Sequence, residues 1–117
     1  IYAGADAFIM PSRSEQCGLS QMIASRYGTV PIVHSVGGLR ETVRDYDEGG
    51  GVGDGFAFEG FSGEALLGAV ARAERLFRRD RAAFTALGQR IMQRDFSWHS
   101  SAERYMQVYR RVVQNER

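Results

Sequence analysis

The sequence predicts an α/β fold in which a parallel sheet is covered by helices. Two continuous apolar runs, at residues 7–10 and 30–33, are typical of strands that are buried on both faces. After these runs, apolar residues recur at helical spacing, most clearly from residue 62 onwards. Because strands that alternate with helices pair in parallel through right-handed crossovers, we expect one such sheet.

Three strands are expected, over residues 7–10, 30–33 and 56–58. Pro11 cannot donate to a strand ladder and therefore ends the first strand, and Pro31 fits best near the beginning of the second. Three short strands make a thin sheet, and the chain begins without Met, at Ile1, in what reads as the last turn of a helix. We therefore expect the chain to be part of a longer protein with further strands upstream.

The predicted helices cover residues 18–27, a short stretch at 39–43, and three longer stretches that begin after Ser62, Asp80 and Ser97. These last three residues are expected N-caps, because a side-chain oxygen there can accept a hydrogen bond from an amide of the first turn. In the final helix Trp98, Tyr105 and Tyr109 repeat at helical spacing. This spacing favours burial, either in the core or against another domain.

A polar, glycine-rich loop is expected at residues 45–55, which contain five glycines. Ordering so many glycines costs much conformational entropy, so we expect this loop to be mobile and disordered at the surface. It cannot be a Walker phosphate loop, because the chain has no Lys, and its glycine spacing does not fit a dinucleotide-binding fingerprint.

The composition excludes several classes of function. The 117 residues are 44% hydrophobic and 25% charged, as in ordinary globular domains, and a net charge of +1 gives no strong field for nucleic acid or an anionic membrane. One Cys and two distant His cannot build a zinc site or an internal disulfide. No apolar run approaches the roughly 20 residues that span a bilayer. We predict no metal, no nucleic acid and no membrane, and a cytoplasmic location, or a plastid only if the source is a plant.

The connection between the first strand and the following helix, residues 11–19, is a candidate anion site. The first amides of a helix have no partner within it and carry the positive end of its dipole. Glu15 lies just ahead of these amides, which suits a ligand that joins a phosphate to a polar, uncharged group, as in a nucleotide sugar. The alternative is a plain connection with a surface Glu, and the local pattern leaves both open.

The loop after the second strand should reach the same place, because ligands of open α/β sheets bind beyond the carboxyl ends of the strands. Gly37 and Gly38 are expected to face that crevice, either as a tight turn or to let the backbone approach a ligand. His34 has no visible Asp or Ser partner, so we expect a loop residue rather than a base. Cys17 lacks a matching His, so packing or ligand contact is favoured over nucleophilic catalysis.

Residues 5–21 strongly resemble the C-terminal-domain signature of bacterial glycogen synthases and plant starch synthases. The match continues at the same spacing over residues 26–33 and 37–43, and residues 96–98 and 105–109 look like the ending of that family. The resemblance implies a GT-B architecture, in which two Rossmann-type domains face a cleft. Residues 1–117 would be an incomplete, Rossmann-like C-terminal domain that binds a nucleotide sugar, residues 97–117 its terminal helix, and the N-terminal domain would be missing.

The resemblance further implies a retaining transfer of glucose from ADP-glucose, or UDP-glucose in some members, to the non-reducing end of an α-1,4-glucan, with no cofactor and no metal. Glu15 would be the catalytic residue, near the donor glucose, and would stabilise positive charge at the anomeric carbon. Cys17 and Gly18 would line the glucose pocket. The amides of Leu19 and Ser20 would hold the diphosphate, in agreement with the helix-end argument.

In this interpretation Gly37 and Gly38 form the supporting turn of the site. Two positions depart from the family pattern: Gln16 replaces a usual Pro, which changes loop stiffness, and Ile23 removes a possible ribose contact, which leaves the donor base open. Because the family's other diphosphate-binding residues would lie upstream, we expect the fragment alone to be inactive. The alternatives are another retaining GT-B glycosyltransferase with a different donor or acceptor, and a non-catalytic nucleotide- or glucan-binding module.

Overall fold

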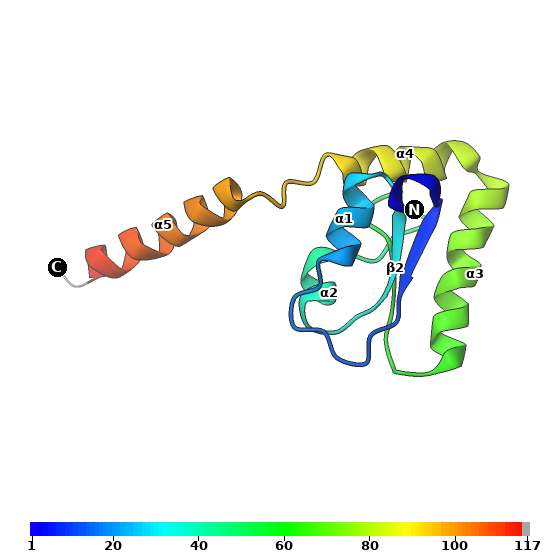
Figure 1. Cartoon of the computed structure of the whole chain (residues 1–117), viewed down its shortest axis with the longest axis horizontal. Coiled ribbons are helices and arrows are strands. Elements are labelled where there is room, and N and C mark those ends of the chain that lie inside the picture. Colours follow the sequence, from blue (N-terminus) through cyan, green and yellow to red (C-terminus); the bar gives the residue numbers. More distant parts are fainter. Residues whose placement is uncertain (116–117) are drawn as a thin grey trace.

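The computed structural model describes residues 1–115 and contains one parallel sheet with helices on both faces (Figure 1). The strands are β1 (Ala7–Met10), β2 (Val30–His34) and β3 (Phe56–Phe58), in the order β1-β2-β3. Both strand pairs are parallel, with Ala7 opposite Val30 and Ile32 opposite Phe56. The predicted α/β class and the three predicted strands are confirmed, and Pro31 lies near the beginning of β2, as expected.

The helices follow the predicted order: a 3-10 turn η1 (Tyr2–Gly4), α1 (Ser20–Arg26), α2 (Gly37–Thr42), α3 (Gly63–Arg79), α4 (Arg81–Met92) and α5 (Trp98–Asn115). The start of α1 lies later than residue 18, because Gly18 has a φ of 72°, which no right-handed helix accepts. The start of α2 lies before residue 39, because the Leu39 amide already donates to the Val36 carbonyl at 3.0 Å.

All three predicted N-caps are confirmed by hydrogen bonds. Ser62 Oγ accepts from the amide of Ala65 at 3.1 Å, and Asp80 Oδ1 accepts from the amide of Ala83 at 2.8 Å. The hydroxyl of the third cap, at position 97, accepts a longer bond of 3.4 Å from the amide three residues on. Each cap satisfies one of the amides that the first turn of its helix leaves unpaired.

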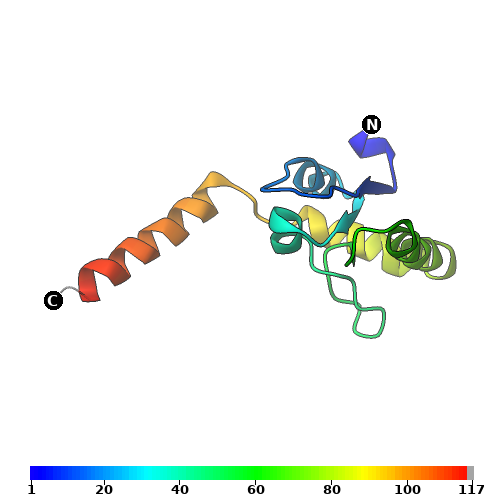
Figure 2. The same cartoon turned by 90° about the horizontal axis from the view of Figure 1, so that it is seen from below.

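Helices lie on both faces of the sheet (Figure 2), and the two faces have separate cores. The smaller core joins Val33 of β2 to Leu39 and Val43, in and just after α2. The larger core joins the opposite face to α3 and α4. Its buried members are Val30, Ile32, Tyr46, Phe56, Phe58, Ala69, Ala73, Phe84, Leu87 and Ile91. Helices cover both faces of the sheet, α4 crosses one end of the strands, and the 11–19 loop lies at the opposite end (Figure 1).

His34 is not the loop residue that the sequence suggested. It is the last residue of β2, opposite Phe58 in the register, and only 6% of its surface is exposed. Its ring stacks on the Phe58 ring at a centroid distance of 5.2 Å. The prediction was wrong because pairing with β3 extends the second strand by one residue, which the apolar run did not indicate.

The glycine-rich loop is also not disordered, contrary to expectation. A backbone bridge joins Asp47 to Val52 across it. From α4, the Arg90 guanidinium donates to the carbonyl oxygens of Gly51 and Gly53, both at 2.9 Å. These bonds offset the entropy that argued for disorder, and they come from a helix too distant in sequence to be anticipated.

Asp54, within the same loop, is a buried carboxylate held by two arginines. It is 3% exposed, its Oδ2 lies 2.8 Å from Arg44 Nε, and it also pairs closely with Arg94. Burial by itself raises the pKa of Asp54, but the hydrogen bonds from Arg44 and Arg94 outweigh it and hold this pKa below its ordinary value. The ion pair between Asp54 and Arg94 connects the glycine-rich loop to the segment that leads into α5.

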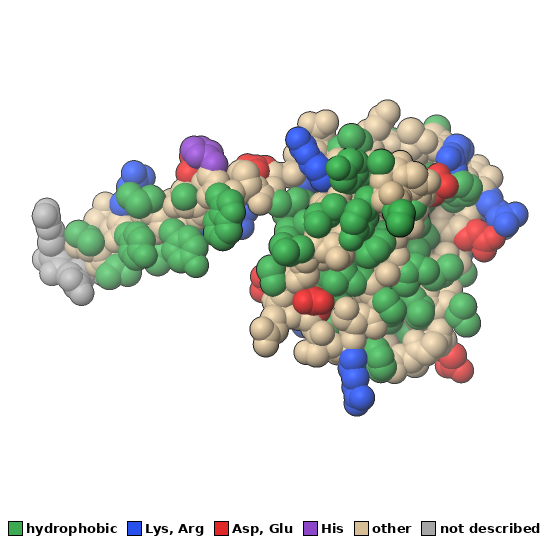
Figure 3. Space-filling view, viewed as in Figure 1, with side chains coloured by type: hydrophobic (Ala, Val, Ile, Leu, Met, Phe, Trp, Pro, Cys, Tyr) green, Lys and Arg blue, Asp and Glu red, His purple; other side chains and the backbone are tan. Residues whose placement is uncertain are grey.

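The aromatic stripe of α5 is exposed, so the expectation that it joins the core is wrong in this structure. Exposed fractions are 88% for Trp98, 65% for Tyr105 and 60% for Tyr109. The helix projects away from the α/β body, and apolar side chains gather along one of its sides (Figures 1 and 3). The second interpretation, a surface that docks on another domain, stays a prediction. Within residues 1–115, no helix combines the length and hydropathy needed to cross a membrane.

We expect Asp54→Asn to lower the free energy of unfolding by about 2 kcal/mol at neutral pH, because it removes charge-assisted hydrogen bonds to a buried group. The native pKa lies below that of the unfolded chain, so this stabilisation is present above about pH 4 and is lost as the pH falls through the native pKa. Urea unfolding across this pH range measures both effects, and the variant should lose less stability on acidification than the wild type.

Glu74→Gln is the matched control, because Glu74 pairs with Arg78 on an exposed helix surface, at 2.8 Å. Such surface pairs contribute about 0.5 kcal/mol or less. Equal losses in the two variants would contradict the structural role assigned to Asp54.

Candidate functional site

The candidate site lies at the carboxyl end of the sheet, where two loops meet. Residues 11–19 leave β1 and lead into α1, and residues 35–36 leave β2 and lead into α2 (Figure 1). The Gly38 amide donates to the carbonyl oxygen of Glu15 at 3.2 Å, which joins the two loops directly. The structure therefore brings Glu15 and the turn at Gly37 and Gly38 together, as the shared edge of a parallel sheet predicts.

Two glycines allow this contact because a side chain would not fit at either position. A Cβ on Gly37 would lie 1.9 Å from the Glu15 carbonyl oxygen, and a Cβ on Gly38 would lie 2.2 Å from that of Cys17. Gly37 also has a φ of 44°, in the left-handed region. The positive φ of Gly37 fits the tight-turn interpretation. The backbone that approaches both glycines is that of the first loop, and the approach of the turn to a ligand stays a prediction.

The remaining predicted site residues lie at the start of α1. Gly18 is buried, whereas Cys17 and Leu19 are exposed and Ser20 is half-buried. Leu19 is the N-cap residue, and its side chain makes no capping bond. Among residues 1–115, no acceptor is found for the amide N–H groups of Leu19 and Ser20. The start of this helix therefore presents unpaired donors, and Glu15 is half-buried in the loop that precedes them.

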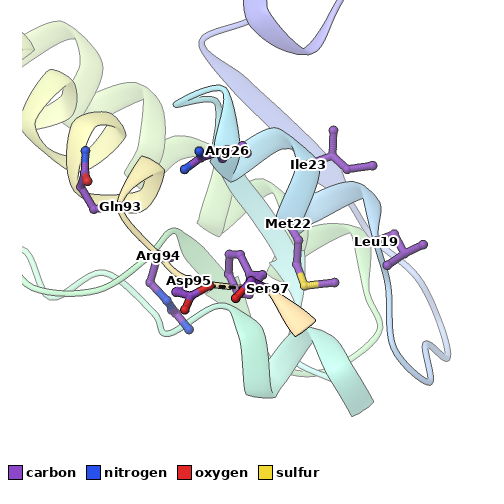
Figure 4. A pocket seen from close by; sticks show the side chains of 9 residues that line it. Leu19, Met22, Ile23, Arg26, Gln93, Arg94, Asp95 and Ser97 are labelled. Carbon is purple, nitrogen blue, oxygen red and sulfur yellow. Dashed lines mark hydrogen bonds between the residues drawn. The ribbon is translucent and has the colours of Figure 1, made fainter. Parts of the chain in front are cut away.

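A cavity of about 630 Å³ adjoins this region (Figure 4). Its walls are Leu19, Met22, Ile23 and Arg26 from α1, and residues 93–97 after α4. Leu19 is the only predicted ligand-binding residue that lines it. The cavity therefore flanks the site formed by the two loops, without containing Glu15.

One side of this cavity carries a carboxylate. The Ser97 amide donates to Asp95 Oδ1 at 2.8 Å, and the hydrogen bonds from Ser97 hold the pKa of Asp95 below its ordinary value. The Asp95 carboxylate is therefore ionised at neutral pH, and one of its oxygens already accepts a hydrogen bond within its own loop. Across residues 1–115, no group of three or more His, Cys, Asp or Glu side chains is placed to hold a metal ion.

His34 lies at the same edge and has partners that sequence reasoning missed. Its Nδ1 lies 2.8 Å from the carbonyl oxygen of Ser12. Because a carbonyl can only accept, Nδ1 carries the hydrogen, and in the neutral ring Nε2 is the acceptor. The ring also meets Phe61 at 5.6 Å, and Arg13 lies over the Phe61 ring at 5.7 Å. The ring thus braces the first loop against β2, and no local sequence signal marks this contact.

The sequence model of the family described as "Glycosyl transferases group 1" matches residues 1–85, which include both loops of the site. The chain belongs to this family. It is 51% identical, over 114 residues, to a glycogen synthase from Desulforudis audaxviator. That alignment covers 97% of this chain but 23% of the relative, so the chain spans about a quarter of the length of such proteins.

Two solved structures of other proteins show the same fold. The catalytic domain of starch synthase IV from Arabidopsis thaliana, bound to ADP and acarbose, superimposes with a TM-score of 0.85 at 40% identity. The match covers 97% of this chain and 24% of the starch synthase chain. Sucrose-phosphate synthase from Thermosynechococcus elongatus matches with a TM-score of 0.65 at 27% identity, over 97% of this chain and 27% of its own. These likenesses confirm the predicted resemblance and the GT-B-type α/β class.

We expect Gly38→Ala to lower the free energy of unfolding by about 2–3 kcal/mol, because the added Cβ would overlap the Cys17 carbonyl and force the two loops apart. Gly68→Ala is the control: Gly68 is exposed within α3, and a Cβ there meets no atom within 4 Å. It should raise stability by up to about 1 kcal/mol, since Ala favours a helix over Gly. Urea denaturation compares the two, and a neutral Gly38→Ala would show that the loops do not depend on backbone contact.

Proposed function

We propose that this chain is the donor-binding part of a glycogen synthase- or starch synthase-like enzyme. The reaction would transfer glucose from ADP-glucose to the non-reducing end of an α-1,4-glucan, with retention of the anomeric configuration. The observation that carries the proposal is the pair of unpaired amides at Leu19 and Ser20, at the end of the loop that contains Glu15. The glycogen synthase relative and the ADP-bound starch synthase structure support this choice over other transfers.

In the proposed site the donor diphosphate accepts hydrogen bonds from the amides of Leu19 and Ser20. Hydrogen bonds to a charged group contribute about 1.5–3 kcal/mol each, and pre-aimed donors stabilise charge as it develops on the leaving diphosphate. Because α1 is only seven residues long, these direct bonds matter more than its dipole. Glu15 would bind the donor glucose and stabilise positive charge at the anomeric carbon, and Cys17 and Gly18 would line the glucose pocket.

The proposal assigns the rest of the machinery to a longer protein. An N-terminal domain would close the other side of the cleft and complete the diphosphate site, and the described chain alone would be inactive. No metal is assigned to the reaction, since amides and arginines of both domains would neutralise the diphosphate. We place the activity in the cytoplasm, in agreement with the exposed, unpaired thiol of Cys17, which suits a reducing compartment.

The runner-up is a retaining transferase of the same architecture with another donor or acceptor, such as UDP-glucose. The likeness to sucrose-phosphate synthase favours it. Ile23 lines the cavity without offering a polar group and leaves the donor base open. A non-catalytic module that binds nucleotide or glucan is a third candidate.

Glu15→Ala in the full-length enzyme should lower kcat by about 100- to 1000-fold, because the carboxylate would no longer stabilise charge in the transition state. Glucose transfer from ADP-glucose to glycogen measures this effect. The control is Glu41→Gln, which alters an exposed carboxylate of α2 and should keep the wild-type rate. Wild-type activity of Glu15→Ala would refute the catalytic assignment.

Calorimetric titration of the full-length protein separates the three candidate functions. We expect ADP and ADP-glucose to bind more tightly than UDP and UDP-glucose. A preference for the uridine ligands would favour the runner-up, and glucan binding without any nucleotide binding would favour the non-catalytic module.

A further inference from the structure

A buried amide side chain holds the start of the candidate donor loop. Gln21, in the first turn of α1, has no exposed surface. Its Nε2 donates to the carbonyl oxygen of Gly18 at 2.8 Å and lies 3.3 Å from that of Cys17. Its third neighbour is the hydroxyl of Thr42, at the end of α2, at 3.0 Å. The side chain therefore ties the first loop to the helix that follows the second.

Further hydrogen bonds join the same two segments, and we call the whole set, which links residues 15–21 to residues 38–42, the circuit. The Thr42 hydroxyl donates to the Gly38 carbonyl at 2.7 Å, and the Gly38 amide donates to the Glu15 carbonyl at 3.2 Å. Because the Gly18 carbonyl can only accept and the Thr42 hydroxyl already donates to Gly38, the Gln21 amide nitrogen must face both. The orientation of the Gln21 side chain is thus determined by its partners.

This arrangement leaves one polar atom unsatisfied. Gln21 Oε1 is buried and, within the described part of the chain, has no hydrogen-bond partner. An orphaned buried acceptor lowers stability, and an apolar side chain of the same length would avoid that cost. The two donors of the side chain, which satisfy the Gly18 carbonyl and the Thr42 hydroxyl, must therefore outweigh the cost of this orphaned acceptor.

We propose that Gln21, held by Thr42, is a positioning residue that aims the loop amides at the donor diphosphate. In a trans peptide group the C=O and the following N–H point in opposite directions. Holding the Gly18 carbonyl inward therefore turns the Leu19 N–H outward, and holding the Cys17 carbonyl inward does the same for the Gly18 N–H. The ligand side of this inference rests on the proposed function, because it takes ADP or ADP-glucose as the anion.

The first test compares ADP binding by full-length variants, with the Kd measured by calorimetry. Gln21→Met keeps the length of the side chain but removes both donors, and it should raise the Kd for ADP about tenfold, the equivalent of one lost hydrogen bond to a charged group. The KM for ADP-glucose should rise by a similar factor, with a smaller change in kcat.

Thr42 supplies a rescue experiment. Thr42→Val removes the hydroxyl and should weaken ADP binding in the same direction, whereas Thr42→Ser keeps the hydroxyl and should restore it. Ser25→Ala is the matched control, because Ser25 is buried in the same helix and its hydroxyl donates to the Gln21 backbone carbonyl at 2.8 Å, away from the loop. It should leave the Kd unchanged.

A readout without ligand separates this inference from the proposed function. Cys17 is exposed, so its alkylation rate, followed by peptide mass spectrometry, reports the conformation of the loop. Gln21→Met and Thr42→Val should change this rate, and Ser25→Ala should not. A wild type that does not bind ADP would refute the proposed function and with it the ligand side of the inference, while the alkylation rates would still decide whether the circuit holds the loop.

Unchanged ADP affinity and unchanged alkylation in a folded Gln21→Met protein would overturn the inference. If Gln21→Met does not fold, the comparison of Thr42→Val with Thr42→Ser decides, and equal ADP affinity in these two variants would overturn it.

Discussion

The contact between two stretches of backbone is the constraint on which the candidate site depends. The turn at Gly37 and Gly38 lies so close to residues 15 and 17 that no Cβ could be placed between them. Backbone has few soft degrees of freedom, so two loops in such contact hold each other in one conformation. The position of Glu15 relative to the start of α1 is therefore fixed by main-chain packing rather than by the flexible side chains of a surface loop.

Side-chain hydrogen bonds of Gln21 and Thr42 add to the backbone contact between the two loops. Gln21, which also donates to the Thr42 hydroxyl, holds the carbonyls of Cys17 and Gly18 inward, and the amides of the same peptide groups consequently face outward. The circuit reaches further, because the Thr42 carbonyl accepts from Arg94 at 3.3 Å, and Arg94 also holds the buried Asp54. The 11–19 loop and the segment leading to α5 both hydrogen-bond to Thr42 at the end of α2, and the glycine-rich loop joins them through Arg94.

One side of α5 exposes apolar side chains, and the chain spans about a quarter of the length of its relatives. An 18-residue helix with a row of exposed aromatic and aliphatic side chains gains little stability by itself, since most helical stability in proteins comes from tertiary packing. Such a face is suited to burial against further protein, which agrees with the proposal that another domain completes the cleft.

The sequence by itself determined the elements. Apolar runs and helical periods gave three strands and the order of the helices, and local cap chemistry gave Ser62, Asp80 and Ser97, because these signals act between residues close in sequence. It also placed Glu15 and the glycine turn at one edge, since parallel strands end together. The conformation of the glycine-rich loop, the burial of His34 and Asp54, and the hydrogen bonds of Gln21 become visible only in the folded chain. Each of these depends on a partner more than ten positions away, and the free energy of such contacts is invisible to any local pattern.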